Sequence, residues 1–365
     1  GENMKKIDLR KLSSVSSAER AFLTIYISEK STREDVEKAL NKKKKVLKKG
    51  TDDFEYFSEN FRIIMDDIDK NPVKKGTHVI FCCWALDYYE RIALKMAVKD
   101  LIRIDSSPYI LPLAQFEDEY ENYLVIAASN EKTKIYMVSC QKTIKEDDIK
   151  GNIKNHVKVG GWSQQRYERR RDKEFSVYAK DIVEKIRDLA KGIDFRRIVI
   201  VGSKETIREL GDVLPNDLKK LVVGEKALDL KKSEKSVNEE IFSLLWEEER
   251  RTERELWNRT KSRYLKGELG VTGTYDVLYF TKRGRVDSVI VNKNADLKGI
   301  RCRDCEELSD SKTDKCPECG SSSVFEIDLV NEITELLKLS GGEIEFAENI
   351  DELKETGNIA AILRY

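Results

Sequence analysis

Apolar and polar positions alternate with a changing period along the chain, and over its first third the pattern predicts strands and helices in turn. Residues 21–27 are β-branched or aromatic and predict a strand, and Thr32 opens a helix with a capping-type start. Aromatic and aliphatic residues recur at helical spacing over residues 54–64, and residues 78–84 predict a second, buried strand. We therefore expect a mixed α/β domain over residues 1–112.

The middle of the chain repeats the alternation of strand and helix. Two apolar runs at residues 123–128 and 134–139 are joined by a polar turn and predict a β-hairpin. The run at residues 197–201 is apolar throughout, which is typical of a buried strand in a parallel sheet. Helical patterns follow it, so an α/β layer is expected. We place this second domain at residues 113–232.

The last third begins with a charged helix at residues 237–265, which contains no glycine or proline. Shorter patterns then predict strand 286–291, helix 328–339, strand 343–346, helix 351–356 and strand 360–365. Residues 275–280 fit a short helix or a strand. The whole chain is therefore predicted to be α/β (mixed α+β) with three domains, the third at residues 233–365.

Composition limits the classes of partner. At 365 residues the chain is too long for one ordinary core, and its 67 basic and 67 acidic residues cancel. Only local clusters can then indicate nucleic acid, and the densest is the lysine run at residues 42–49. A solvated helix face is the usual meaning of such a run, and RNA contact is the less common one.

No apolar run approaches the roughly 18 residues that span a bilayer. We expect a monomeric cytoplasmic protein with no membrane partner.

Four cysteines form a cluster within residues 302–319. Cys302 and Cys305 make one Cys-x2-Cys pair, and Cys316 and Cys319 make a second, ten residues further on. Two such hairpins complete a tetrahedral set of four thiolates, which leaves no open position for catalysis. The spacing predicts a structural Zn²⁺ knuckle, with iron as the competing metal and an incidental or redox role as the alternative.

A glycine pair at Gly160 and Gly161 begins the most unusual stretch. It continues Trp162-Ser163-Gln164-Gln165 and then carries a cluster of arginines at Arg166, Arg169, Arg170 and Arg171. Glycines and glutamine amides followed by arginines suit a flexible loop that enters a site lined by phosphate groups. The plainer alternative is a surface turn, with the arginines opening a long helix that runs through residues 175–190.

No catalytic fingerprint for another reaction accompanies this stretch. The chain has only His78 and His156, and it lacks a phosphate-binding Gly-x4-Gly-Lys motif, a dinucleotide-binding Gly-x-Gly-x2-Gly motif and a Gly-x-Ser-x-Gly elbow. An enzyme without its own acid, base or nucleophile must place a water molecule by amide hydrogen bonds in surroundings that its partner supplies.

These residues resemble the class I peptide-chain release factors of archaea and eukaryotes and their Pelota relatives. The segments that carry the resemblance are Ser163, Arg166, Tyr167, Arg169 and Arg171 after the glycines, Tyr275–Leu278, Gly284–Asp287, and Ile359–Tyr365 at the end of the chain. In that family a Gly-Gly-Gln loop promotes peptidyl-tRNA hydrolysis on the ribosome. The resemblance implies an RNase H-like middle domain, and a C-terminal α/β/α domain with the knuckle inserted where archaeal factors carry theirs.

Two departures refine the resemblance. Trp162 follows the glycines where a termination factor has glutamine, and Gln164 comes two positions later. This Gly-Gly-x-Ser-Gln form is similar to the Vms-like clade, which frees stalled chains from tRNA on large ribosomal subunits. The region between residues 42 and 53 is lysine-rich and lacks the Asn-Ile-Lys-Ser loop that reads stop codons. Ribosome rescue without a stop codon is therefore implied.

The resemblance also assigns roles and partners. Gly160 and Gly161 would shape the loop, and Gln164, with Gln165 as the substitute, would orient water or stabilise the oxyanion. Basic side chains would neutralise rRNA phosphates, namely Lys158, Arg166, Arg169, Arg170 and Arg171. The implied partners are the large ribosomal subunit, peptidyl-tRNA and rRNA, and a translational GTPase or an AAA unfoldase is left open.

Three other functions fit parts of this pattern. A Pelota-like factor would bind or split ribosomes without cleaving an ester, and a stop-codon release factor could carry an altered loop. A zinc-ribbon DNA or transcription protein is less favoured, because no recognition helix or basic domain accompanies the cysteines.

Overall fold

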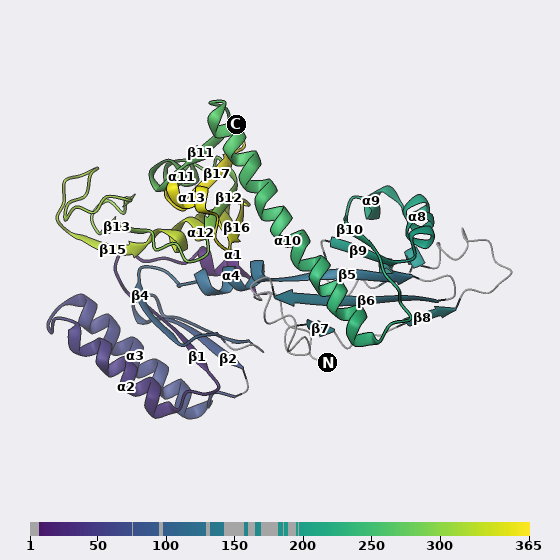
Figure 1. Cartoon of the computed structure of the whole chain (residues 1–365). Helices are drawn as coiled ribbons and strands as arrows, with labels where there is room; N and C mark the ends of the chain where they lie inside the picture. Colours follow the sequence, from purple (N-terminus) through teal and green to yellow (C-terminus); the bar gives the residue numbers. More distant parts are fainter. Residues whose placement is uncertain are drawn as a thin grey trace. The chain divides into compact units, whose positions relative to one another are not determined.

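The structure is a computed structural model, and it describes residues 7–74, 76–94, 98–128, 132–141, 157–159, 165–168, 182–184, 186–188, 195 and 197–365. Contacts between residues divide the chain into two compact units (Figure 1). The first unit combines Gly1–Gln115 with Thr260–Tyr365, and the second is Phe116–Arg259. Strands and helices alternate in both, so the predicted mixed α/β class is confirmed.

The N-terminal part of the first unit is an antiparallel sheet with the strand order β3-β2-β1-β4. Its elements are α1 (Leu9–Ser13), β1 (Phe22–Ser28), α2 (Arg33–Val46), α3 (Asp52–Lys70), β2 (Thr77–Cys83), the short 3-10 helix η1 (Trp84–Leu86), β3 (Tyr88–Leu94), β4 (Leu101–Asp105) and α4 (Leu111–Glu119). Thr32 and Asp35 form a complete capping box at the start of α2, as its sequence predicts. Alternate β1 residues, among them Leu23 and Ile25, pack with apolar residues of α2 and α3.

The C-terminal part of the first unit contains a sheet of order β11-β17-β12-β16 and a small sheet of order β14-β13-β15. The elements are β11 (Gly270–Thr272), α11 (Thr274–Lys282), β12 (Val286–Asn292), β13 (Lys298–Cys302), β14 (Leu308–Ser309), β15 (Val324–Asp328), α12 (Leu329–Ser340), β16 (Glu343–Ala347), α13 (Asp351–Glu355) and β17 (Ile359–Leu363). The strands and helices predicted after residue 286 are confirmed. Residues 275–280, left open between helix and strand, lie in α11.

One hydrophobic core joins the two parts of the first unit. It contains Tyr26 and Phe81 from the N-terminal sheet together with Phe325 and Ile333 from the C-terminal part. Buried polar contacts cross the same boundary, because the Asn331 side chain accepts hydrogen bonds from the backbone N–H groups of Ile110 (2.9 Å) and Leu111 (3.0 Å). Residues 106–111 thus form a buried connection and not an exposed linker. The three-domain division at 112 and 232 stays an interpretation of the sequence.

The second unit is built on a sheet of order β10-β9-β5-β6-β7, with β8 also paired to β6. Its elements are β5 (Tyr120–Ala128), β6 (Lys132–Gln141), β7 (Val157–Val159), β8 (Gln165–Glu168), β9 (Arg197–Gly202), α8 (Lys204–Val213), α9 (Asn216–Lys219), β10 (Val222–Ala227) and the first part of α10 (Glu234–Leu265). The predicted hairpin is β5 and β6, and the predicted parallel strand is β9, which pairs with β5 and β10. Both predictions are confirmed.

Both faces of this sheet are covered, which explains why its central strands are apolar throughout. One face packs on residues that include Ile182, Ile186 and Leu210, and the other packs on Ile241 and Phe242 of α10. At Gly202 an added Cβ would lie 1.9 Å from the carbonyl oxygen of Ala128, so only glycine permits this approach of β9 to β5. Across the described ranges, no helix has the length and the apolar character that crossing a membrane would require.

Candidate functional site

Strands β7 and β8 hold the two ends of the Gly-Gly stretch on one edge of the sheet. Both pair antiparallel with β6, β7 opposite residues 138–140 and β8 opposite residues 132–135. The other edge of β6 is occupied by β5. Val159 and Gln165 therefore lie on the same edge of the sheet, where Figure 1 shows β7 and β8 beside β6.

The register shows that the stretch is longer than a continuous strand would be. Val159 lies opposite Val138 and Gln165 lies opposite Ile135. Two positions of β6 lie between these partners, whereas five residues join Val159 to Gln165, so the chain has three more residues here than a continuous strand would need. Extra residues in an edge strand often occur next to functional sites.

The predicted helix at the arginines is wrong at its first position. Arg166 lies in strand β8, opposite Lys134, and not at the start of a helix. The short alternating run of Gln165 to Glu168 pairs with the open edge of β6, and this pairing satisfies backbone groups that a helix would have bonded internally.

The structure places only part of the predicted loop site. Lys158 lies in β7 opposite Ser139, and Gln165 and Arg166 lie in β8. The remaining predicted loop residues lie outside the described part of the chain, and their roles stay predictions: these are Gly160, Gly161, Gln164, Arg169, Arg170 and Arg171.

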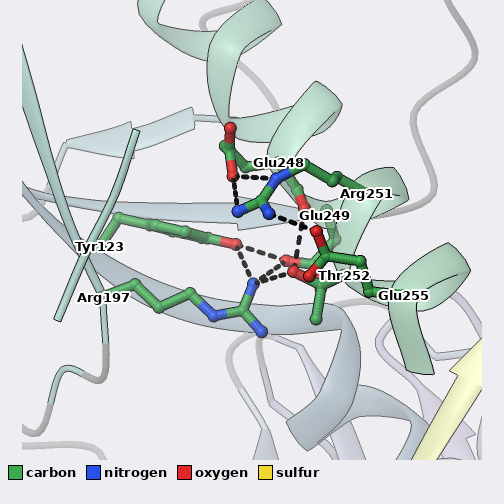
Figure 2. A network of polar contacts seen from close by, with 7 residues as sticks. All are labelled: Tyr123, Arg197, Glu248, Glu249, Arg251, Thr252 and Glu255. Carbon is green, nitrogen blue, oxygen red and sulfur yellow. Dashed lines mark hydrogen bonds and ion pairs between the residues drawn. The ribbon is translucent and has the colours of Figure 1, made fainter. Parts of the chain in front are cut away.

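A buried polar network fixes α10 on the sheet that carries this loop (Figure 2). Tyr123 on β5 donates its hydroxyl proton to the carboxylate of Glu249 on α10. Arg197 on β9 donates from Nη1 to the same oxygen of Glu249, at 3.1 Å. The Glu249 side chain is 2 % exposed, so its charge is balanced inside the protein rather than by water. On the outer side of the helix, Arg251 pairs with Glu248 at 2.7 Å and with Glu255 at 2.5 Å.

Removing the cation of this network should destabilise the second unit. The change Arg197→Met removes a guanidinium that is bonded to the buried Glu249 carboxylate, and we expect it to lower the free energy of unfolding by about 3 kcal/mol. The change Arg251→Met removes an arginine that is 49 % exposed, and it should cost less than about 1 kcal/mol. Urea unfolding of both variants, followed by circular dichroism, measures the difference. Equal losses would contradict the assigned role of Glu249.

The lysine run forms the exposed end of the α2–α3 hairpin. Lys42, Lys43, Lys45, Lys48 and Lys49 are all exposed, and within the described ranges none of these five side chains forms an ion pair. Lys44 differs, because its ammonium group lies 5.2 Å from the ring centre of Phe54 and 5.9 Å from that of Phe61. Val46 is 80 % exposed beside them. The five exposed lysines make this surface strongly basic.

The four predicted metal ligands lie together. The sulfur atoms of Cys302, Cys305, Cys316 and Cys319 all lie within 4.8 Å of one another, with 3.6 Å between Cys302 and Cys319 and 3.5 Å between Cys305 and Cys316. Tetrahedral zinc with Zn–S bonds of about 2.3 Å requires sulfur–sulfur distances of roughly 3.8 Å. The cluster therefore fits a metal such as zinc.

Local backbone groups favour the deprotonated form of one of these thiols, Cys302. Hydrogen bonds from backbone N–H groups, that of Cys305 first, lower the pKa of Cys302 to about 7. The thiolate is the form that binds metal. β14 and β15 flank β13, so the first Cys-x2-Cys pair begins at the end of a three-stranded sheet. The cluster has four protein ligands and no open position, which supports a structural role for a metal.

A second cluster of ionisable groups is buried in the first unit. Asp105 at the end of β4, Glu332 and Glu335 on α12, and Arg301 on β13 are all buried. Burial raises the pKa of Asp105 to about 6, and burial together with the charge of Asp105 raises the pKa of Glu332 to about 8. Arg301 opposes both shifts and donates to the hydroxyl of Ser106 at 3.0 Å.

These shifts predict that stability falls as the pH rises. Between about pH 4.3 and pH 8 the folded chain keeps a proton on Glu332 that the unfolded chain has released, so unfolding becomes easier by about 1.4 kcal/mol per pH unit for that proton. Glu332→Gln should remove this dependence and raise the midpoint of thermal unfolding at pH 8.5 relative to the wild type. Glu326→Gln, at an exposed position on β15, is the control. A wild type and a Glu332→Gln variant with parallel pH profiles would contradict the prediction.

Sequence patterns alone did not reveal this buried cluster. The groups come from segments more than 200 residues apart, for example Ser107 and Glu335, whose side chains are hydrogen-bonded at 2.9 Å. The only signal in the sequence is a set of carboxylates at helical spacing on α12, which also fits a solvated helix face.

Comparison with known proteins places the chain among relatives of release factors. Residues 108–245 match the family model described as "Bacterial archaeo-eukaryotic release factor family 10". Peptide chain release factor subunit 1 of Methanocaldococcus jannaschii is 27 % identical over 300 residues, which cover 73 % of this chain and 71 % of the relative. The protein of that name from Thermococcus onnurineus is 27 % identical over 297 residues, with the same coverage.

Two solved structures also align with this chain, at low identity. The archaeal translation termination factor aRF1 shares 16 % identity, covers 98 % of this chain and 96 % of its own, and has a TM-score of 0.27. Dom34 of S. cerevisiae, described as a translation termination-like factor, shares 10 % identity, covers 79 % of each chain and has a TM-score of 0.43. The sequence matches show that the chain is homologous to the archaeal release factors.

Proposed function

We propose that this homologue of the archaeal release factors is a translation factor that hydrolyses peptidyl-tRNA on stalled large ribosomal subunits without reading a stop codon. The observation that carries the proposal is the register of β7 and β8 on β6. The five residues that join these strands are three more than a continuous strand would need, and they include Gly160, Gly161 and Gln164. The sheet that bears both strands has two covered faces. A loop on such a support can carry an amide into a site that another molecule completes.

The proposed chemistry uses the amide of Gln164, with Gln165 as the substitute. Hydrolysis of the peptidyl-tRNA ester requires attack by water on the carbonyl carbon, and negative charge then develops on the carbonyl oxygen. An amide can orient the water through its oxygen and donate an N–H to the oxyanion. The ribosome and the tRNA would supply the remaining groups. Lys158 and Arg166 on the flanking strands, with Arg169, Arg170 and Arg171, would neutralise rRNA phosphates.

Independence from a stop codon is supported by the end of the α2–α3 hairpin. That end carries five exposed lysines and lacks the Asn-Ile-Lys-Ser sequence of stop-codon reading factors. Lysine side chains attract RNA phosphates without distinguishing bases, so this surface suits contact with RNA of any sequence. We propose that the protein acts in the cytoplasm, and that the four-cysteine cluster holds a structural Zn²⁺.

A Pelota-like factor that binds ribosomes without hydrolysis is the second candidate. Trp162 favours it, because an indole follows the glycines where a hydrolytic termination factor carries its glutamine. In that case the loop would only dock on the large subunit.

Release of a labelled nascent chain from purified complexes tests the proposal. Isolated large subunits carrying peptidyl-tRNA should release the peptide when the protein is added. Whole ribosomes with a stop codon or a sense codon in the small-subunit site should show no codon preference. Release that requires a stop codon would favour a termination factor, and binding without any release would favour the Pelota-like alternative.

A further inference from the structure

Arg303 lies within the cysteine cluster in the sequence, and its side chain forms hydrogen bonds with residues outside the cluster. It stands between the ligand positions Cys302 and Cys305, and its side chain is 20 % exposed. Nη2 donates to both carboxylate oxygens of Asp53, at 3.1 and 3.2 Å, and Nη1 donates to Glu19. The guanidinium carbon also lies 5.0 Å from the ring centre of Phe325. One side chain of the knuckle is thus bound to the N-terminal part of the first unit.

We propose that metal binding at the four-cysteine cluster positions Arg303 so that the knuckle fastens the α2–α3 hairpin to the C-terminal part of the first unit. We call the three residues Arg303, Glu19 and Asp53 the clasp. Glu19 precedes β1, and Asp53 lies in the first turn of α3, the helix that follows the lysine run. The cluster would then control the attachment of the hairpin that carries the exposed lysines, as well as its own local fold.

The composition of the knuckle explains why a metal is needed to position Arg303. Within residues 303–324, all of which the structure describes, Cys316 is the only buried side chain. Few backbone hydrogen bonds support the segment, among them Arg303 N–H to the Ser323 carbonyl at 2.9 Å and Cys302 N–H to the Glu307 carbonyl at 3.0 Å. A segment without an apolar core depends on metal ligation for its order. Four thiol groups without a metal would leave the backbone at Arg303 poorly held.

The hydrogen bonds between Arg303 and Asp53 depend on the position of the Arg303 guanidinium. A guanidinium that binds a carboxylate through two hydrogen bonds requires a defined orientation, and small displacements lose one of them. Asp53 is also shared with Arg20, whose Nη1 lies 3.6 Å away and whose guanidinium carbon lies 5.8 Å from the ring centre of Phe325. Without Arg303, the more distant Arg20 would be left as the cation beside Asp53, and Glu19 would lose its bond to the knuckle.

Thermodynamic linkage allows two tests: the effect of Zn²⁺ on the clasp, and the effect of the clasp on Zn²⁺ affinity. If Zn²⁺ stabilises the clasp, the clasp must strengthen Zn²⁺ binding by the same factor, and couplings of this kind are typically about 5- to 150-fold. Removal of both carboxylates, in the Glu19→Gln/Asp53→Asn double variant, should therefore weaken Zn²⁺ affinity at least about fivefold. Neither substitution lies near the cysteine ligands in the sequence.

The experiment uses the full chain with Zn²⁺ added or removed by a chelator. Hydrogen exchange measured by mass spectrometry should accelerate in peptides covering residues 17–22 and 51–57 when Zn²⁺ is removed. Arg303→Ala should give the same acceleration while Zn²⁺ is still bound. Lys298→Ala is the matched control and should leave exchange unchanged: Lys298 begins β13, the strand that ends just before Arg303, and it pairs with Glu326 at 3.3 Å. Chelator competition measures the Zn²⁺ affinity of each variant.

Two results would overturn the proposal. The first is exchange in residues 17–22 and 51–57 that does not change on Zn²⁺ removal while residues 302–319 lose protection. The second is an unaltered Zn²⁺ affinity in the Glu19→Gln/Asp53→Asn variant. If Arg303→Ala fails to fold, the double variant still decides, because it leaves the knuckle intact.

Discussion

Replacement of Gln164 and Gln165 together by alanine is expected to slow peptide release from large-subunit complexes by about 100-fold or more, because removal of one well-placed oxyanion donor alone costs roughly 10²–10³ in rate. Gln164 is the first candidate for this amide and Gln165 is its substitute, so only the double variant removes both candidates. We therefore expect a larger loss in the double variant than in Gln165→Ala. Binding to the subunit should persist, since the basic residues provide most of the affinity.

The measurement is the rate of release of labelled peptide at saturating protein, with subunit binding followed by co-sedimentation. Gln141→Ala removes an amide from β6 of the same sheet, outside the Gly-Gly stretch, and should retain full activity. Full release by both single variants and by the double variant would refute the assigned role. Loss of release together with loss of binding would indicate docking and not chemistry.

Loss of the metal is expected to have the second large effect. Cys316→Ser removes a ligand that is buried at the centre of the knuckle, and the variant should bind no Zn²⁺ at the cluster. A ligand at 1,000 times its dissociation constant stabilises the folded state by about 4 kcal/mol. The wild type should therefore unfold at a higher temperature with Zn²⁺ than with chelator, and the Cys316→Ser variant should show no such difference.

Metal content and the midpoint of thermal unfolding are the two measurements. Cys83→Ala, a buried thiol on β2 outside the cluster, is the control and should keep both Zn²⁺ and the dependence on it. Stoichiometric Zn²⁺ in purified Cys316→Ser protein would contradict the assignment of four cysteine ligands. Binding of iron in place of zinc by the wild type would change the metal and leave the four ligands in place.

Features that depend on neighbouring residues could be predicted from the amino-acid sequence alone. The capping box at Thr32, the β5–β6 hairpin and the uninterrupted helix α10 follow from local hydrogen bonds and from the spacing of apolar residues. The four-cysteine cluster is also local, because two Cys-x2-Cys turns ten residues apart can meet without help from distant parts of the chain.

Other features depend on residues that are far apart in the chain, and only the tertiary structure decided them. The pairing of Arg303 with Asp53 spans 250 positions, and the shared core joins residues 7–115 to residues 260–365. The register of β7 and β8 on β6 also had to be seen, because helix and strand compete closely in a short polar run and an open sheet edge decided for the strand. The sequence thus determined the residues of the Gly-Gly stretch and of the metal cluster. The folded chain decided that the strands flanking the stretch pair with the edge of β6. It also decided that Arg303, within the cysteine cluster, contacts Glu19 and Asp53.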